Sequence, residues 1–168
     1  MSTRILVAYA SPRGSTAGIA QAIGKELQSA GYSVDVVELK AVSSLEGYHA
    51  VVIGGPIYMG KIVGDVGKFV GKFRDALMKI PVAAFTVGMS PVGKDPAGDI
   101  DRVLKIFHAA LAPLEPVAET MFAGRVDPEQ LSFIQKWMIK KAKAPVGDFR
   151  DWDVIAAWAK DLPGQLKV

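Results

Sequence analysis

Cysteine is absent from this sequence, and its absence excludes several kinds of site. Without thiolates the chain cannot form disulfides, bind zinc or an iron–sulfur cluster through cysteine, or use a cysteine nucleophile. Long apolar runs are also lacking: none approaches the roughly 20 residues of a membrane-spanning helix, and the run from Ile5 to Ala10 is too short for a signal-peptide core. A reducing, cytoplasmic setting fits these features.

A large excess of one charge is the third missing feature. The 20 Lys and Arg residues and the 17 Asp and Glu residues leave a net charge of +3, which does not choose between anionic small molecules, nucleic acid and an anionic membrane. Half of the 168 residues are hydrophobic, which suffices for one buried core. With no internal repeat and no linker composition, residues 1–168 are predicted to form a single domain.

Apolar runs and helical periodicities alternate along the chain. Runs typical of buried strands occupy residues 4–9, 33–39, 48–54, 82–88 and 117–123. Apolar side chains at helical spacing predict helices over residues 16–30, 65–78, 99–112, 128–144 and 152–162. Strands that alternate with helices across short connections imply parallel pairing through right-handed crossovers. The predicted fold is therefore α/β, a three-layer sandwich around a five-stranded parallel sheet.

The loops at the carboxyl ends of the strands are the candidates for a site, because ligands of an open α/β sheet bind there. The loop after the first strand combines hydroxyl groups with a glycine, directly before a helix. Its backbone N–H groups, the positive end of the helix dipole and its side chains favour a phosphate site. Capping of the helix by Ser15 or Thr16 is the simpler alternative. The candidate phosphate-binding residues are Ser11, Arg13, Gly14, Ser15 and Thr16.

The loops after the third and fourth strands are candidates for holding a flat ring. Residues 55–61 match the first seven positions of a nucleotide-binding P-loop, but Ile62 stands where that motif needs a Ser or Thr hydroxyl for magnesium. Nucleotide hydrolysis is therefore disfavoured, and Tyr58 is interpreted as an aromatic wall beside the phosphate or as a half-buried loop residue. The candidate wall residues are Pro56, Ile57, Tyr58, Met59 and Gly60, together with Gly88, Met89 and Ser90.

The same residues resemble those of the flavodoxin superfamily. The phosphate loop of that superfamily reads as a hydroxyl residue, two variable residues, Gly, a small polar residue and Thr, a pattern that residues 11–16 reproduce. The resemblance extends over the whole chain in the order of its elements. It implies a flavodoxin-like strand order of 2-1-3-4-5 and non-covalently bound FMN, with the phosphate in the first loop and the isoalloxazine between the other two.

Within the superfamily, the chain looks most like the menaquinone-dependent protoporphyrinogen IX dehydrogenases of haem biosynthesis. The likeness rests on residues 122–125, on the aromatic and basic stretch 133–141, and on Asp151 and Trp152 at the last helix. It implies an FMN-dependent oxidoreductase that takes electrons from protoporphyrinogen IX and gives them to a quinone. The alternatives are a flavodoxin that carries electrons between redox proteins and an NAD(P)H:quinone reductase. The flavin would carry the chemistry, so neither a catalytic side chain nor a metal site is predicted.

The stretch 133–143 has two interpretations of its own. Phe133, Ile134, Trp137 and Met138 form an apolar stripe, and four lysines accompany it without an acidic residue. The stripe fits a helix that packs on the sheet with a solvated basic face. It also fits an interfacial helix that holds the protein at the inner face of an anionic membrane. No nucleic-acid-binding motif is found, so nucleic acid is not expected as a partner.

Overall fold

Five parallel strands form the centre of the structure, a computed structural model that describes residues 2–143 and 146–168. The strands are β1 Arg4–Tyr9, β2 Ser33–Glu38, β3 Ala50–Tyr58, β5 Val82–Gly88 and β6 Ala118–Ala123. They lie in the order β2-β1-β3-β5-β6, so the predicted order is confirmed. The strand order reverses between β1 and β3, which is where an open sheet of this kind forms its ligand crevice.

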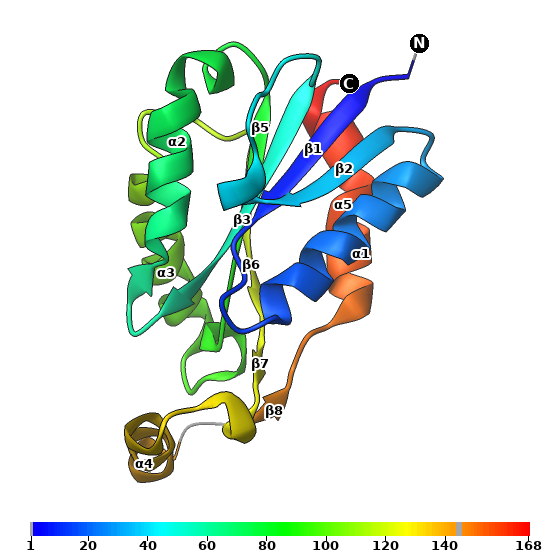
Figure 1. Ribbon diagram of the computed structural model, residues 1–168. Coiled ribbons are helices and arrows are strands. Elements are labelled where there is room, and N and C mark those ends of the chain that lie inside the picture. The colour runs from blue at the N-terminus through cyan, green and yellow to red at the C-terminus, as the bar shows by residue number, and fades with distance from the viewer. Residues whose placement is uncertain (1, 144–145) are drawn as a thin grey trace.

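Helices on both faces complete the sandwich. They are α1 Ser15–Ser29, α2 Gly64–Leu77, α3 Pro96–Ala110 and α5 Trp152–Leu166. α1 and α5 lie side by side on one face of the sheet, and α2 and α3 cover the other (Figure 1). Each pair buries an apolar stripe, in which Ile19 and Ile155 belong to one core cluster and Phe69 and Phe107 to the other. The predicted three-layer architecture is confirmed.

The third strand is longer than predicted and ends in a hairpin. A short strand β4, Lys61–Ile62, pairs antiparallel with the end of β3. Met59 and Gly60 between them have positive φ angles of 50° and 77°, the geometry of a two-residue type I′ turn. The predicted strand end at residue 54 is therefore wrong, since the chain continues as strand and carries Tyr58 beyond the carboxyl edge of the sheet.

Several helix boundaries also differ from the prediction. α3 begins three residues early because the Asp95 side chain caps it, and α5 extends four residues further. The helix predicted over 128–144, whose last residue lies outside the described residues, is divided in two. A 3₁₀ turn, Pro128–Gln130, precedes α4, Phe133–Ala142. Ser132 caps the start of α4 in a capping box with Gln135, which explains why the predicted helix is interrupted before residue 133.

α4 does not pack on the sheet, so one of the two interpretations of residues 133–143 is wrong. Strands β7 Arg125–Val126 and β8 Gly147–Asp148 pair as an antiparallel ribbon that leads the chain beyond the carboxyl edge, where α4 lies apart from the sandwich (Figure 1). α5 takes the place beside α1 instead. Phe133 of α4 is consequently 86% exposed.

An ion pair ties the ribbon to the sandwich. Arg150 donates hydrogen bonds to both carboxylate oxygens of Asp148, at 2.9 and 2.7 Å. These hydrogen bonds lower the pKa of Asp148 to about 2. The same guanidinium lies over the Trp152 ring at 4.8 Å, and a Cβ on Gly18 of α1 would lie 2.8 Å from its Nη1. Arg150 thus connects the ribbon with both helices of one face.

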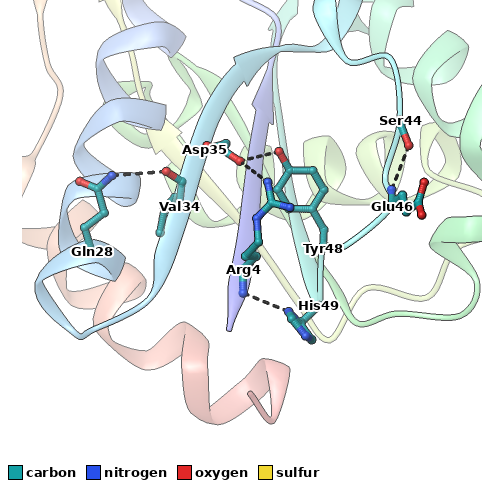
Figure 2. Close-up of polar contacts among 8 residues, drawn as sticks. All are labelled: Arg4, Gln28, Val34, Asp35, Ser44, Glu46, Tyr48 and His49. Atoms are coloured by element: carbon teal, nitrogen blue, oxygen red, sulfur yellow. Dashed lines mark hydrogen bonds and ion pairs between the residues drawn. The ribbon is translucent and has the colours of Figure 1, made fainter. Parts of the chain in front are cut away.

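Polar side chains pair with one another near the amino ends of the strands (Figure 2). Tyr48 donates a hydrogen bond of 2.6 Å to the carboxylate of Asp35, and Arg4 donates to the same oxygen at 3.0 Å. The Tyr48 hydrogen bond is the main cause of a lowered pKa at Asp35. These contacts join β1, β2 and the segment before β3.

Candidate functional site

The loop predicted to bind phosphate passes from the carboxyl end of β1 into α1. Gly14 has a φ of 87°, the left-handed conformation that glycine adopts without strain, and it turns the chain into the helix. The first N–H groups of a helix have no partner within it. Ser11 Oγ accepts from one of them, the N–H of Ala17, at 3.0 Å. The N–H groups of Ser15 and Thr16 precede it at the positive end of the helix.

Thr16 carries a buried hydroxyl group that nothing in the described structure satisfies. Its side chain is 1% exposed, and Oγ1 has no hydrogen-bond partner among the described residues. An unsatisfied buried polar group costs roughly 1–3 kcal/mol. The alternative in which Ser15 or Thr16 caps α1 is wrong, because Gly14 is the cap residue and the side-chain bond comes from Ser11.

Two arginines lie beside this loop. The Arg13 guanidinium lies over the Tyr58 ring, 5.5 Å from its centroid. Arg125 of β7 approaches Gly14, with its Nη2 3.6 Å from the point that a Cβ there would occupy. Both positive charges favour an anion at the start of α1. Arg125 was missed as a site residue, although it comes two residues after β6, the last strand of the central sheet, and therefore lies at the same edge.

A cavity of about 280 Å³ opens beside the loop. Its walls come from the phosphate loop, the β3–β4 hairpin, the segment after β5, and the chain from Gly124 into α4. The structure thus brings the phosphate loop together with both loops predicted to hold a ring. Eight of the predicted site residues line the cavity: Arg13, Ser15, Pro56, Ile57, Tyr58, Met59, Gly88 and Met89.

The other five predicted residues do not line this cavity: Ser11, Gly14, Thr16, Gly60 and Ser90. The first three belong to the phosphate loop itself, and Ser11 also borders a smaller hollow of about 120 Å³. Gly60 occupies the tip of the hairpin turn. Ser90 begins a 3₁₀ turn, Ser90–Val92, in the segment between β5 and α3.

Tyr58 is the aromatic side chain of the cavity, and it stands at the end of a strand rather than in a loop. It is 39% exposed. Burial raises the pKa of its hydroxyl, and the neighbouring Arg13 opposes this shift only in part, so the phenol is neutral near pH 7. Gly88 allows Ile57 and Met121 to pack close to the backbone, because a Cβ there would lie 2.7 Å from Ile57 Cγ2 and 2.8 Å from Met121 Cε.

One further wall comes from residues that were not predicted for the site. Leu131, Gln135, Met138 and Ile139 line the cavity from α4 and its approach. Within α4, Met138 and Ile139 follow Gln135 by three and four residues, which places these three on one side of the helix. The sequence contained this periodicity, but the position of α4 relative to the sheet depends on the β7–β8 ribbon.

The histidines of the described residues serve the structure. His49 Nδ1 accepts a hydrogen bond of 3.0 Å from the backbone N–H of Arg4, and His108 pairs with Glu119 at 2.8 Å. No group of three or more His, Asp and Glu side chains within 2–143 and 146–168 is arranged to hold a metal ion. In the same part of the chain, none of the helices has the length and apolar character needed to span a bilayer.

Comparison with known proteins assigns this arrangement to a family. The family model of the flavodoxin domain matches residues 6–153. The chain belongs to the flavodoxin domain family. The phosphate loop and every residue of the cavity wall fall within the matched part of this flavodoxin domain. No curated protein is similar enough in sequence for a significant match.

Solved flavodoxins share the fold of this flavodoxin domain at low sequence identity. One from the domain Archaea is 19% identical, with a TM-score of 0.57 over 99% of this chain and 100% of that chain. A Pseudomonas aeruginosa flavodoxin mutant is 15% identical, with a TM-score of 0.56 over 99% and 100%. A Fusobacterium nucleatum flavodoxin mutant bound to flavin mononucleotide is 13% identical, with a TM-score of 0.57 over 99% and 96%. These likenesses confirm the fold.

Proposed function

We propose that the protein binds FMN and acts as an oxidoreductase that transfers electrons from a porphyrinogen-type donor to a quinone. The observation that carries this proposal is the buried, unpartnered Thr16 hydroxyl in a helix N-terminal loop beside a cavity of about 280 Å³. An anion site next to a largely apolar cavity is what a mononucleotide with a flat head group requires.

The loop supplies groups that suit the phosphate of FMN. Thr16 has a hydroxyl proton to donate, and the N–H groups of Ser15 and Thr16 stand at the positive end of α1. Ser11 accepts from the backbone, and its own hydroxyl proton is still available for donation. Arg13 and Arg125 bring the positive charge that a phosphate dianion needs.

The cavity suits the ring system. Tyr58 offers an aromatic face, and Met59 and Met89 are polarizable side chains that adapt to a flat ligand. FMN, when bound, supplies the redox chemistry, while the residues of the chain bind and orient it. Leu131, just before α4, and Met138 of α4 add apolar side chains to the cavity wall.

The walls contributed by α4 support the proposed substrate class. Apolar side chains there suit flat, water-insoluble molecules such as quinones and porphyrinogens. The resemblance of the sequence to the menaquinone-dependent protoporphyrinogen IX dehydrogenases supports the same two substrates. An electron carrier is the second candidate, favoured by membership of the flavodoxin domain family.

A pair of matched substitutions tests the FMN site. Thr16 and Thr86 are both buried threonines whose hydroxyls lack a partner among the described residues, but only Thr16 lies in the phosphate loop. Thr16→Val should weaken FMN binding about 10- to 100-fold, because a hydrogen bond to a charged group contributes roughly 1.5–3 kcal/mol. Thr86→Val should bind FMN like the unmodified protein. Titration followed by flavin fluorescence measures both, and equal affinities would remove Thr16 from the site.

Anaerobic reoxidation separates the two candidate functions. The FMN-loaded protein is reduced with a stoichiometric amount of dithionite and mixed with a menaquinone analogue while the flavin absorbance is followed. Rapid, complete reoxidation, and reduction of the oxidised protein by a porphyrinogen, are the expected results. Slow reoxidation by the quinone combined with rapid reoxidation by an oxidised redox protein would favour the electron carrier. Reduction by NADPH would instead support the NAD(P)H:quinone reductase.

A further inference from the structure

The outer face of α4 combines exposed apolar side chains with lysines. Phe133 is 86% exposed, Ile134 69% and Trp137 56%. Residues 131–143 include four lysines, at positions 136, 140, 141 and 143, and no acidic residue. Exposed apolar patches of this kind mark contact surfaces in soluble proteins.

The two faces of α4 have different surroundings. Gln135 and Met138 line the cavity and define the inner face. Phe133 and Trp137 are four residues apart and lie on the outer face, which we define as the face that carries them and the lysines. The Lys141 ammonium lies 4.8 Å from the centroid of the Trp137 ring, so charge and aromatic surface adjoin directly. Among the described residues, no element covers the outer face.

We infer that the outer face of α4 docks on an anionic membrane surface. Phe133 and Trp137 would enter the headgroup region, and the lysines would meet the lipid phosphates. α4 stands beyond the carboxyl edge of the sheet and apart from the sandwich, so a flat surface can approach it (Figure 1). This docking does not depend on the proposed FMN chemistry.

The nature of the charges favours a membrane over a protein partner. Lysine is depleted at protein interfaces, where arginine is enriched. Its compact ammonium on a flexible stem does not impose the fixed, bidentate geometry of arginine. Every cationic residue between 131 and 143 is a lysine, which suits a fluid surface of anionic headgroups and an interfacial helix.

Docking through the outer face would bring the cavity close to the bilayer, because the inner face of the same helix forms one of the cavity walls. A quinone dissolved in the membrane could then reach the cavity without passing through water. This consequence, unlike the docking itself, rests on the function proposed above.

Vesicle sedimentation with a matched control tests the docking. The full-length protein, with and without added FMN, is mixed at low salt with vesicles of phosphatidylglycerol and phosphatidylcholine, and with phosphatidylcholine alone. Lys140→Glu/Lys141→Glu should lower the partition coefficient on anionic vesicles about 30-fold or more, because each lysine near such a surface contributes about fivefold. Lys68→Glu/Lys72→Glu changes the charge equally on exposed positions of α2 and should bind like the unmodified protein.

Quenching by brominated lipid tests the orientation. Brominated acyl chains should quench part of the tryptophan fluorescence, and Trp137→Phe should abolish that part while it preserves vesicle binding. Absence of binding to anionic vesicles at low salt would overturn the inference, and so would equal losses in the two double variants. Binding to an acidic ferredoxin that depends on Lys140 and Lys141, without vesicle binding, would assign the outer face to a protein partner instead. Since the protein without FMN is also measured, failure to bind FMN would not affect the outcome.

Discussion

The polar groups at the two ends of the central sheet differ in whether they have hydrogen-bond partners within the chain. Near the amino ends, Tyr48 and Arg4 both donate to Asp35, at 2.6 and 3.0 Å. At the carboxyl ends, the Thr16 hydroxyl is buried without a partner among the described residues, and the start of α1 presents backbone N–H groups. The same parallel strands therefore support one end that is satisfied internally and one that is not.

Polar groups that are paired within the chain stabilise the fold, whereas unpaired ones are available to bind a ligand. A pair of satisfied polar groups contributes a small net stability whatever else the protein does. A buried polar group without a partner costs stability, and in a loop at a helix N-terminus beside a cavity it is placed to bind a group from outside the chain. Thr86 also has a buried hydroxyl without a described partner, so it is the position of Thr16 in the loop at the start of α1, beside the cavity, that makes the carboxyl end the candidate site.

The largest effect is expected from a substitution in the scaffold that both ends share. A Cβ on Gly54 would overlap the ring of Phe85. That ring packs against Phe122 and Trp158, at centroid distances of 5.8 and 6.2 Å, and has no room to turn away. Gly54→Ala should lower the free energy of unfolding by roughly 3 kcal/mol, the upper range for an overpacked core.

The control for this substitution is Gly71→Ala in α2, where a Cβ would meet no described atom within 4 Å. It should stabilise the protein by up to about 1 kcal/mol, because alanine is the better helix former. Urea unfolding measures both variants. If Gly54→Ala lowered the free energy of unfolding by less than about 1 kcal/mol, the Phe85 ring would have moved to make room for the added Cβ.

A smaller effect, confined to the carboxyl end, is expected at Arg125. Removing its charge from the neighbourhood of Gly14 should weaken FMN binding about tenfold and reduce the dependence of that binding on salt. Arg125→Gln is compared with Arg74→Gln, which removes an exposed charge from α2. Both should unfold at nearly the same urea concentration as the unmodified protein. Equal FMN affinities in the two variants would exclude Arg125 from the anion site.

The alternating strands and helices, and hence the layers, could be predicted from local apolar patterns. The strand order could be predicted only from the resemblance to the flavodoxin superfamily, because strand pairing is not a local property. The extension of β3 could not, because residues 54–56 are Gly, Gly and Pro, which ordinarily mark a loop. Their strand conformation depends on pairing with β5, and that of the following Ile57 and Tyr58 on pairing with β4, neither of which the sequence shows. Gly55 also has a packing reason, since a Cβ there would lie 2.5 Å from Cγ2 of Val66.

That the loop predicted to bind phosphate and the two segments predicted to hold a ring lie around one cavity could be predicted, because each follows a strand at the same edge of the sheet. The α4 wall could not be predicted in the same way. An amphipathic stripe indicates that one face of a helix is buried, but not what buries it. In α4 the large aromatic side chains Phe133 and Trp137 are exposed, whereas Gln135 lies in the cavity wall.

The smallest effect is expected at the amino end, where the pairing itself can be broken. Tyr48→Phe removes the hydrogen bond to Asp35 and should lower the free energy of unfolding by about 0.5–1 kcal/mol at pH 7, since the carboxylate is partly exposed to solvent. FMN affinity should not change.

The same substitution should also alter how the free energy of unfolding depends on pH. The Tyr48 hydrogen bond holds the pKa of folded Asp35 below its ordinary value of 3.8. The stabilisation is therefore fully present above pH 3.8 and is lost as the pH falls through the folded pKa.

Urea unfolding at pH 7 and at pH 3 therefore tests whether the pair acts through the ionised carboxylate. The difference between Tyr48→Phe and the unmodified protein should shrink at the lower pH, and Asp35→Asn should abolish it at both. In the double variant the two losses should not add, because both substitutions remove the same hydrogen bond. A Tyr48→Phe loss that is independent of pH, or additive with Asp35→Asn, would mean that the Tyr48 ring stabilises the amino end by packing. The contrast between the two ends would then rest on the carboxyl end alone.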